Sequence, residues 1–370
     1  MDALALDPIA AVTAAEPYPY YAQLVSERPF FRDDRLGMWV ATSSEAVEAV
    51  LVSPALGVRP AMEPIPAAIA GTALGEVFGA LVRWQDGTAH APLKAFVATV
   101  LAEPGAGDIA AIARNCANDL APAMQPAHPQ SVRAFAFSLP TLAMATFLGL
   151  SGSDARDAIT ATRAMSYALL PGATESALSA GNVAARALRK SFGGIARSAQ
   201  LDRDAEISNT VGFLLQGFDA TAGLIGNTLV AIAREPSLAR AATSGDLRDL
   251  ERLVAEVARY DSPVHSTRRY ARHDVALLEA TIRRDESILV VLAAANRDPA
   301  ANAEPERLIP ERVSPRTYTF GFGVHACAGM RTATTIAAVA IEYLLRAGVE
   351  PATWVAPGYE PRVNIRIPAP

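Results

Sequence analysis

A single cysteine near the C-terminus, Cys327, stands in a glycine-rich stretch whose residue types could bind a metal or attack a substrate. The stretch reads Phe320-Gly321-Phe322-Gly323-Val324-His325-Ala326-Cys327-Ala328-Gly329. Gly321 and Gly323 permit backbone angles that a Cβ atom disfavours, so the chain can fold tightly around the cysteine. Apolar residues at helical spacing follow over 330–345, and Gly348 suits the end of that helix. Cys327 is therefore expected at a helix N-terminus, where N–H groups and the helix dipole stabilise a thiolate.

Several chemical roles are open to such a cysteine. It can be a small hydrophobic residue of the core. A nucleophile needs a base, and His325 is only two residues away, which rarely gives the right geometry, although a distant histidine could serve. A zinc site needs further cysteines or histidines in paired spacings, and the sequence has none. A haem iron needs one axial thiolate and apolar surface for the ring.

The pattern Phe-x-x-Gly-x-His-x-Cys-x-Gly resembles the haem-binding signature of the cytochrome P450 superfamily. Other family elements stand upstream in the expected order from about residue 15. The resemblance implies a mainly α-helical cytochrome P450 fold, a single domain over 1–370, with a small β lobe from about 15–60 and 262–295. It also implies one haem b per chain, between the long central helix and the Cys-loop helix. Cys327 would be the proximal iron ligand, in a cofactor-binding loop that includes Phe320, Gly321 and Gly329.

The long helix expected from about Asp204 to Glu235 resembles the family's central helix, which carries Ala/Gly-Gly-x-Asp/Glu-Thr-Thr. The matching residues are Gly217, Asp219 and Thr221. Two positions depart from the pattern. Gln216 replaces a small residue, and Ala220 replaces the threonine that the family usually uses for proton delivery.

The change at Ala220 matters because activation of O2 needs protons, and a positioned hydroxyl normally holds the water that carries them. Thr221 points about 100° away around the helix. Gln216 lies one turn back on the same face. We therefore hypothesise that Gln216 or the substrate organises the proton relay, with Asp219 as the acid. The alternative is that Gln216 only shapes the substrate pocket.

The resemblance also implies contacts to the haem propionates. His90 and Lys94 stand where the family often has His-x-x-x-Arg, so the cation is kept but the bidentate arginine fork is lost. A solvated helix start is the alternative for this pair. Arg269 matches the propionate-binding arginine, with Arg268 as the competing candidate, and His325 is a further contact.

An amphipathic helix is expected over 246–260, with Glu256 and Arg259 one turn apart. Such a pair alone is common and usually contributes little. Here it matches the family's structural Glu-x-x-Arg pair, with Arg312 as the third member. These residues would serve folding and haem retention.

The residues expected to line the substrate site are Phe218 of the central helix and Val264, His265 and Ser266 after Pro263. A lone histidine such as His265 is at least as often simply packed. Three further structural expectations concern chain breaks and strands. Residues 108–200 are expected to be helical with breaks at Pro140 and Pro171, and 357–366 alternates like a strand.

Composition limits the class of protein. The 370 residues are 51% hydrophobic and 19% charged, which is typical of a globular helical protein. A net charge of −5 gives no reason to expect a nucleic-acid partner. Cys116 and Cys327 make no disulfide framework, which favours a reducing, cytoplasmic location, and Cys116 is expected to be inert core. No signal peptide or membrane anchor is expected.

The resemblance implies a monooxygenase that oxidises a small organic molecule with O2 and electrons from a ferredoxin and a ferredoxin reductase. Ala220 and the short loops favour a specialised step of secondary-metabolite biosynthesis, such as hydroxylation, oxidative coupling or cyclisation. One alternative is a peroxide-driven haem oxidase, although the arginine and carboxyl arrangement typical of that variant is not visible here. Another is a non-catalytic haem protein that binds a ligand. The missing hydroxyl at Ala220 is its only support, and Asp219 argues against it.

Overall fold

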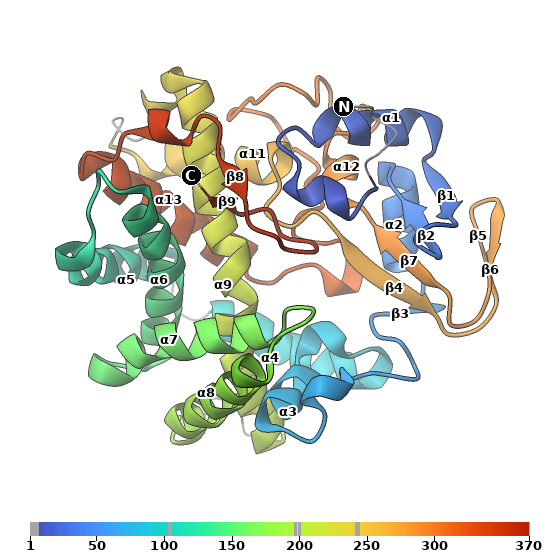
Figure 1. Cartoon of the computed structure of the whole chain (residues 1–370), viewed down its shortest axis with the longest axis horizontal. Coiled ribbons are helices and arrows are strands. Elements are labelled where there is room, and N and C mark those ends of the chain that lie inside the picture. Colours follow the sequence, from blue (N-terminus) through green and yellow to red (C-terminus); the bar gives the residue numbers. More distant parts are fainter. Residues whose placement is uncertain (1–6, 103–105, 196–197, 199–200, 241–244, 370) are drawn as a thin grey trace. The chain divides into compact units, whose positions relative to one another are not determined.

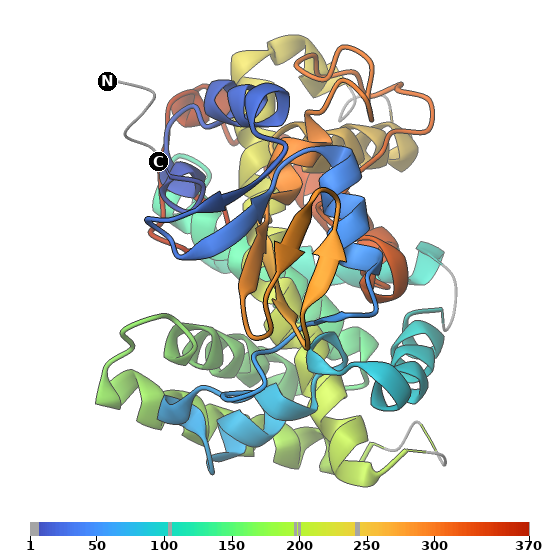
Figure 2. The same cartoon turned by 90° about the vertical axis from the view of Figure 1, so that its right-hand side faces the viewer.

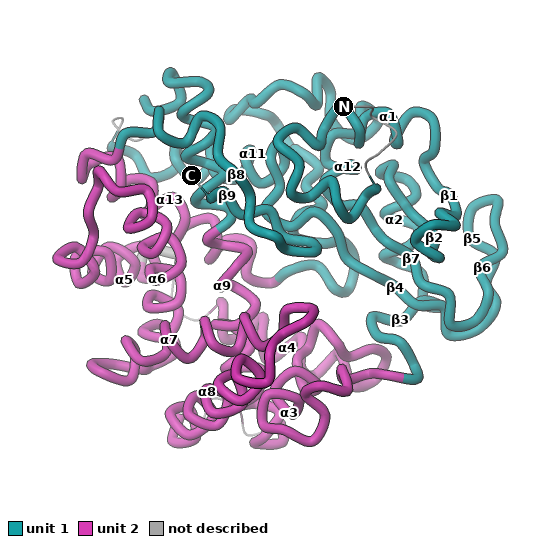
Figure 3. The backbone as a smooth tube through the Cα atoms, in the orientation of Figure 1, with its two compact units in different colours: residues 1–62, 223–327, 350–370 teal, residues 63–222, 328–349 magenta. Residues whose placement is uncertain are grey.

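A computed structural model describes residues 7–102, 106–195, 198, 201–240 and 245–369. The described chain is mainly α-helical with a small β-rich part, which confirms the fold class that the sequence predicts (Figures 1 and 2). It divides into two compact units. Unit 1 consists of residues 1–62, 223–327 and 350–370, and unit 2 of residues 63–222 and 328–349 (Figure 3). Two of the four boundaries fall inside the longest helix, α9 (Arg203–Arg234), and directly after Cys327.

Unit 1 contains all the strands of the described residues. They are β1 (Phe30–Asp33), β2 (Met38–Ala41), β3 (Leu56–Gly57), β4 (Thr267–Ala271), β5 (Val275–Leu277), β6 (Ala280–Ile282), β7 (Ser287–Val290), β8 (Gly358–Tyr359) and β9 (Pro368–Ala369). The main sheet has the order β1-β2-β7-β4-β3, in which only β2 and β7 are parallel. Its strands lie within 30–57 and 267–290, inside the segments from which the sequence predicts the β lobe. The other strands form the pairs β5-β6 and β8-β9.

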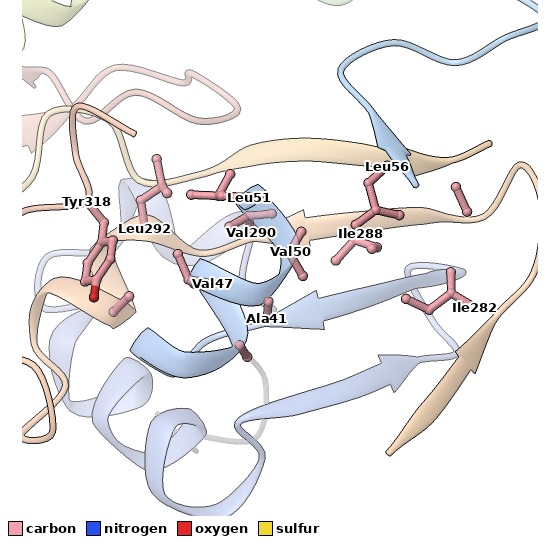
Figure 4. Close-up of a cluster of buried hydrophobic side chains, with 13 residues drawn as sticks. Ala41, Val47, Val50, Leu51, Leu56, Ile282, Ile288, Val290, Leu292 and Tyr318 are labelled. Atoms are coloured by element: carbon pink, nitrogen blue, oxygen red, sulfur yellow. The ribbon is translucent and has the colours of Figure 1, made fainter. Parts of the chain in front are cut away.

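The central strand β7 is buried on both faces of this sheet. Ile288 and Val290 pack into a cluster with α2 (Ser44–Val52), as Figure 4 shows. Leu289, one residue out of phase, packs instead into a cluster with α1 (Tyr18–Glu27). The alternation follows from the two-residue period of a strand. A central strand such as β7 therefore needs consecutive apolar residues, without alternating polar ones.

The remaining helices of unit 1 are α11 (Leu247–Tyr260), α12 (Leu292–Asn296) and the last part of α9. On α11, Arg259 and Glu256 form a buried bidentate ion pair, with N···O distances of 2.9 and 2.7 Å. Arg312 adds a third charge, 3.2 Å from Glu256 Oε1. Arg259 has no exposed surface and Glu256 is 2% exposed, so the three residues are a buried charge cluster.

The regular elements of unit 2 are all helices among its described residues. Its helices are α3 (Ala73–Ala80), α4 (His90–Ala102), α5 (Ala106–Leu120), α6 (Pro129–Phe147), α7 (Gly152–Ala168), α8 (Glu175–Gly193), the first part of α9, and α13 (Met330–Arg346). Close packing of α7 and α8 depends on Gly181, because a Cβ atom there would lie 2.3 Å from the Cβ of Ala168. Phe135 of α6 stacks on Tyr343 of α13 at 5.2 Å between ring centroids. No helix of the described chain is both long and apolar enough to cross a membrane.

Two structural expectations are wrong. Pro140 does not break the helical region but lies inside α6, where the buried neighbours Leu139 and Leu142 stabilise the helix despite the missing N–H. The segment 357–366 is not a continuous strand. It forms only short pairs at β8 and at Ile365, because Pro361 cannot donate to a ladder.

The buried charge cluster leads to a stability prediction. Replacing Arg259 with methionine should lower the free energy of unfolding by about 3–5 kcal/mol, because Glu256 would remain buried without its partner. Arg252→Met on the same helix removes an exposed pair with Asp249 and should cost less than about 1 kcal/mol. Denaturant unfolding of both variants measures the difference. Equal losses of unfolding free energy in the two variants would show that burial does not determine how much an ion pair contributes to stability.

Candidate functional site

The Cys327 loop is closed by its own backbone. The N–H of Cys327 donates to the carbonyl oxygen of Phe320 at 2.6 Å. Gly321 and Gly323 have φ angles of +74° and +69°, a region that side chains with a Cβ disfavour. A short 3₁₀ turn runs over Gly323–His325, and the Cys327 side chain is exposed. The glycines thus do what the sequence predicts, and the thiol is presented outside the core.

Helix α2 packs directly beneath this loop. A Cβ atom on Gly323 would lie 3.2 Å from Cγ1 of Val52 and 3.8 Å from the carbonyl oxygen of Leu51. Tyr318, just before the loop, donates its hydroxyl proton to Glu48 of α2. Burial raises the pKa of Tyr318 well above its usual value, and the bond to Glu48 adds to this, so the tyrosine remains a donor. Helix α2 therefore fixes both the start and the turn of the loop.

A buried amide also holds the residues that lead into the loop. Asn296, the last residue of α12, accepts from the N–H of Tyr318 and donates to the hydroxyls of Ser262 and Thr319. The carbonyl oxygen of Asn296 accepts in turn from Arg259 at 3.1 Å. The charge cluster on α11 is thereby connected to the residues that precede the loop. Asn296 is not among the site residues that the sequence predicts.

The two candidate arginines of β4 lie on opposite sides of the strand. Arg269 is 6% exposed, and its guanidinium donates to the carbonyl oxygen of Arg268 at 2.9 Å. The side chain of Arg268 is exposed. Strand alternation produces this difference. The burial of its side chain favours Arg269 over Arg268 as the candidate for binding a propionate.

His265 is fully buried and bonds to helix α1. Its Nδ1 lies 2.9 Å from the hydroxyl of Tyr21. Burial, and secondarily the charge of Arg366, lowers the pKa of His265 well below 6.5, so the ring is neutral. The position argues against the predicted substrate contact. Val264 forms a bridge to Ile365 and is half-buried.

Of the four predicted substrate contacts, Phe218 is also explained by packing. It is 1% exposed and lies 4.9 Å from Phe137 of α6, centroid to centroid. Packing thus accounts for the positions of Phe218 and His265. All four substrate contacts stay predictions, and Ser266 is 3% exposed.

The polar residues predicted on α9 are held within unit 2. The side-chain amide of Gln216 donates to the carbonyl oxygen of Gly212, one turn back, at 3.0 Å. Asp219 is half-buried, and its Oδ2 accepts from the hydroxyl of Ser166 on α7 at 2.6 Å. Thr221 is 4% exposed, and Ala220 is half-buried. The engagement of Gln216 with its own helix weakens the hypothesis that its amide organises a proton relay.

His90 and Lys94 occupy the first turn of α4. His90 is 8% exposed and Lys94 is half-buried. Because they are four residues apart, they share one face of the helix. A fully solvated helix start, the alternative for this pair, does not describe the buried His90.

The donor set fits a haem iron better than a metal ion held by several side chains. Across the part of the chain that the structure describes, no group of three His, Cys, Asp or Glu side chains is placed to hold a metal ion. Cys327 presents one sulfur on a braced loop, and a haem iron needs one thiolate. Cys116 is buried, its Sγ 3.7 Å from the hydroxyl of Thr146, and burial raises its pKa. Its surroundings are those of a core residue.

Comparisons with known proteins agree with these features. A family model for cytochrome P450 matches residues 199–347. A putative cytochrome P450 133B2 of Xylella fastidiosa is 37% identical over 147 residues, which cover 40% of this chain and 36% of the relative. The biotin biosynthesis cytochrome P450 of Bacillus subtilis is 31% identical over 148 residues, 40% of this chain and 37% of the relative. The matched part of the chain thus spans little more than a third of these curated relatives.

The fold comparison extends over nearly the whole chain. The crystal structure of CalO2 superposes with a TM-score of 0.80 at 24% sequence identity. The match covers 99% of this chain and 97% of CalO2. This likeness concerns the fold.

Three residues of the site could not be found by sequence analysis. Ser166 is 53 residues from Asp219, Tyr21 is 244 residues from His265, and Asn296 lies in an Ala-rich stretch. Each is a common polar residue in a helix, and no local motif marks it. Only the packing of distant helices identifies their partners.

Burial of neutral His265 leads to a pH prediction. The unfolded chain binds a proton near pH 6.5, whereas the folded chain does so only at a much lower pH. As the pH falls below 6.5, the free energy of unfolding should therefore decrease by up to about 1.4 kcal/mol per pH unit from this group. Tyr18, Tyr21, Asp261 and Arg366 are the charged or titratable groups around it.

The comparison with His265→Asn isolates this effect, because asparagine can still hydrogen-bond to Tyr21 but does not titrate. Denaturant unfolding at pH 7, 6 and 5 should show a shallower loss of stability for this variant than for the wild type. His128→Asn, which changes an exposed histidine, is the control and should keep the wild-type slope. Identical slopes for all three proteins would contradict the prediction.

Proposed function

The chain belongs to the cytochrome P450 superfamily, and we propose on this basis that it is a haem-thiolate monooxygenase acting on a small organic molecule. The electrons would come from a ferredoxin and its reductase, as the resemblance to soluble bacterial members suggests. The observation that carries the proposal is the Cys327 loop. Its thiol is exposed, its backbone is closed on Phe320, and α2 and Asn296 hold it on two sides.

One haem b per chain would supply the iron that activates O2, and the thiolate of Cys327 would hold that iron. The task of this chain is to hold the sulfur in place and to keep it deprotonated. The loop geometry serves the first need, because positive φ angles at Gly321 and Gly323 leave little freedom to the backbone around Cys327. Arg269, His325, His90 and Lys94 would neutralise the propionates, on the family resemblance.

Protons and substrate involve other residues. Asp219 would act as the acid that delivers protons, although Ala220 cannot hold a water as the family's threonine does. Val264 and Ser266 would contact the substrate, since Phe218 and His265 are engaged in packing. The relative named for biotin biosynthesis supports a biosynthetic role. We propose a specialised biosynthetic step such as hydroxylation, oxidative coupling or cyclisation.

The function is tested with haem-loaded protein and a varied panel of cyclic dipeptides, aromatic amino acids, polyketides and terpenes. A ligand that shifts the ferric haem absorption toward the high-spin form identifies the substrate class. That ligand is then incubated with a surrogate ferredoxin, its reductase and isotopically labelled O2. An oxidised product, with label where oxygen is inserted, is expected. A tightly bound ligand that gives no product with functioning electron transfer would contradict the proposal.

The two cysteines give a matched pair of variants. Cys327→Ser should change the absorption spectrum of the haem-loaded protein and lower its haem content, because the thiolate ligand is lost. Cys116→Ser, at a buried core position, should keep the wild-type spectrum. Absorption and haem content of both purified proteins provide the measurement. A wild-type spectrum in Cys327→Ser would refute the ligand assignment.

The two arginines of β4 give a second pair. Arg269→Met should weaken haem retention, because a buried cation near the propionates would be lost, at a cost of about 1.5–3 kcal/mol or roughly tenfold or more in affinity. Arg268→Met changes an exposed side chain and should leave retention unchanged. Transfer of haem to an acceptor apoprotein measures both rates. A larger effect from Arg268 would reverse the assignment.

A further inference from the structure

Helix α7 directs a hydroxyl group onto the acid of α9. Ser166 Oγ donates to Oδ2 of Asp219 at 2.6 Å, a short hydrogen bond. Ser166 is 5% exposed, so the bond is largely shielded from water. Both residues belong to unit 2. The position of the carboxylate therefore depends on α7 as well as on its own helix.

A second hydroxyl lies one turn away on the same helix. Thr162 precedes Ser166 by four residues and so shares its face of α7. Thr162 has no exposed surface, and its Oγ1 has no hydrogen-bond partner among the residues that the structure describes. Other buried threonines of this chain, such as Thr210 and Thr228, donate to the carbonyl oxygen one turn back.

A buried hydroxyl without a partner is unfavourable, and such groups are normally satisfied by protein or by an ordered water. A water needs at least two polar partners nearby. Ser166 and Asp219 provide them if the water lies on the face of α7 that carries Thr162. The unpartnered Thr162 and the engaged Ser166 are thus two independent observations at one place.

We propose that Thr162 and Ser166 form a buried water-binding site that positions Asp219. Its role in catalysis rests on the function proposed above. Asp219 would deliver a proton at the reaction site of the function proposed above. Its carboxylate would then take the hydroxyl proton of Ser166, and Ser166 would take a proton from the water. The serine stays neutral, and the hydroxide that remains would be reprotonated from solvent. Hydroxyl groups of α7 thereby replace the one that is missing at Ala220.

The alternative relay through Gln216 has less support. Its amide donates to the carbonyl oxygen of Gly212 within α9. Ser166, in contrast, contacts the acid directly. Ser166 and Thr162 are positioning residues, because they act through Asp219.

The water site is tested without turnover, by thermal unfolding of haem-loaded Thr162→Val. If Thr162 holds a water, valine removes one partner of a satisfied site and should lower the Tm by about 2 °C or more. If the Thr162 hydroxyl binds no water, valine removes a buried group without a hydrogen bond, and the Tm should rise. A rise overturns the water site. Ser153→Ala, at an exposed position of α7, is the control and should leave the Tm unchanged.

The positioning role is tested with Ser166→Ala and Ser166→Thr in the turnover assay. The alanine variant should keep its haem content and its spectral response to substrate. It should lose about tenfold or more of the product formed per electron pair, with an increased solvent deuterium isotope effect. Ser166→Thr keeps the hydroxyl and should recover most of the loss. Wild-type coupling and isotope effect in Ser166→Ala would overturn the role. Absence of product from the wild type would instead refute the proposed function, while the Tm test would still decide the water site.

Discussion

The Cys327 loop depends on the hydrogen bonds that the buried guanidinium of Arg259 donates. The guanidinium donates to both carboxylate oxygens of Glu256 and to the carbonyl oxygens of Asn296, Pro305 and Arg307, so that all five N–H groups have acceptors. Three of these bonds hold segments that are distant in sequence. A buried charge with complete hydrogen bonding is rigid, because breaking any one bond leaves an unsatisfied group.

Two further sets of contacts connect this rigid group to the Cys327 loop. Asn296 connects the guanidinium to the residues directly before the loop, and α2 supports the turn at Gly323. The loop itself then needs only two glycines and one short bond to Phe320. A single thiolate on such a support is suited to bind a haem iron, as proposed above. The carboxylate of Asp219 is held differently, by the Ser166 hydroxyl of another helix, α7.

The sequence was informative where the pattern is local. Helices were expected over about 204–235 and 246–260, and α9 and α11 lie at Arg203–Arg234 and Leu247–Tyr260. The Cys327 loop could be recognised because glycine spacing and a following helix suffice to define it. Side-chain directions could not be predicted in the same way. Phe218 and His265 resembled substrate contacts, yet Phe137 and Tyr21, far away in the sequence, determine where they point.

The central claim is that Cys327 provides the only protein ligand of a haem iron. X-ray absorption of the iron in the haem-loaded ferric protein tests it most directly, because scattering distinguishes sulfur from lighter neighbours. We expect one sulfur in the first coordination shell, together with the haem nitrogens, and its loss in Cys327→Ser. A first shell of nitrogen and oxygen alone in the wild-type protein would contradict the account.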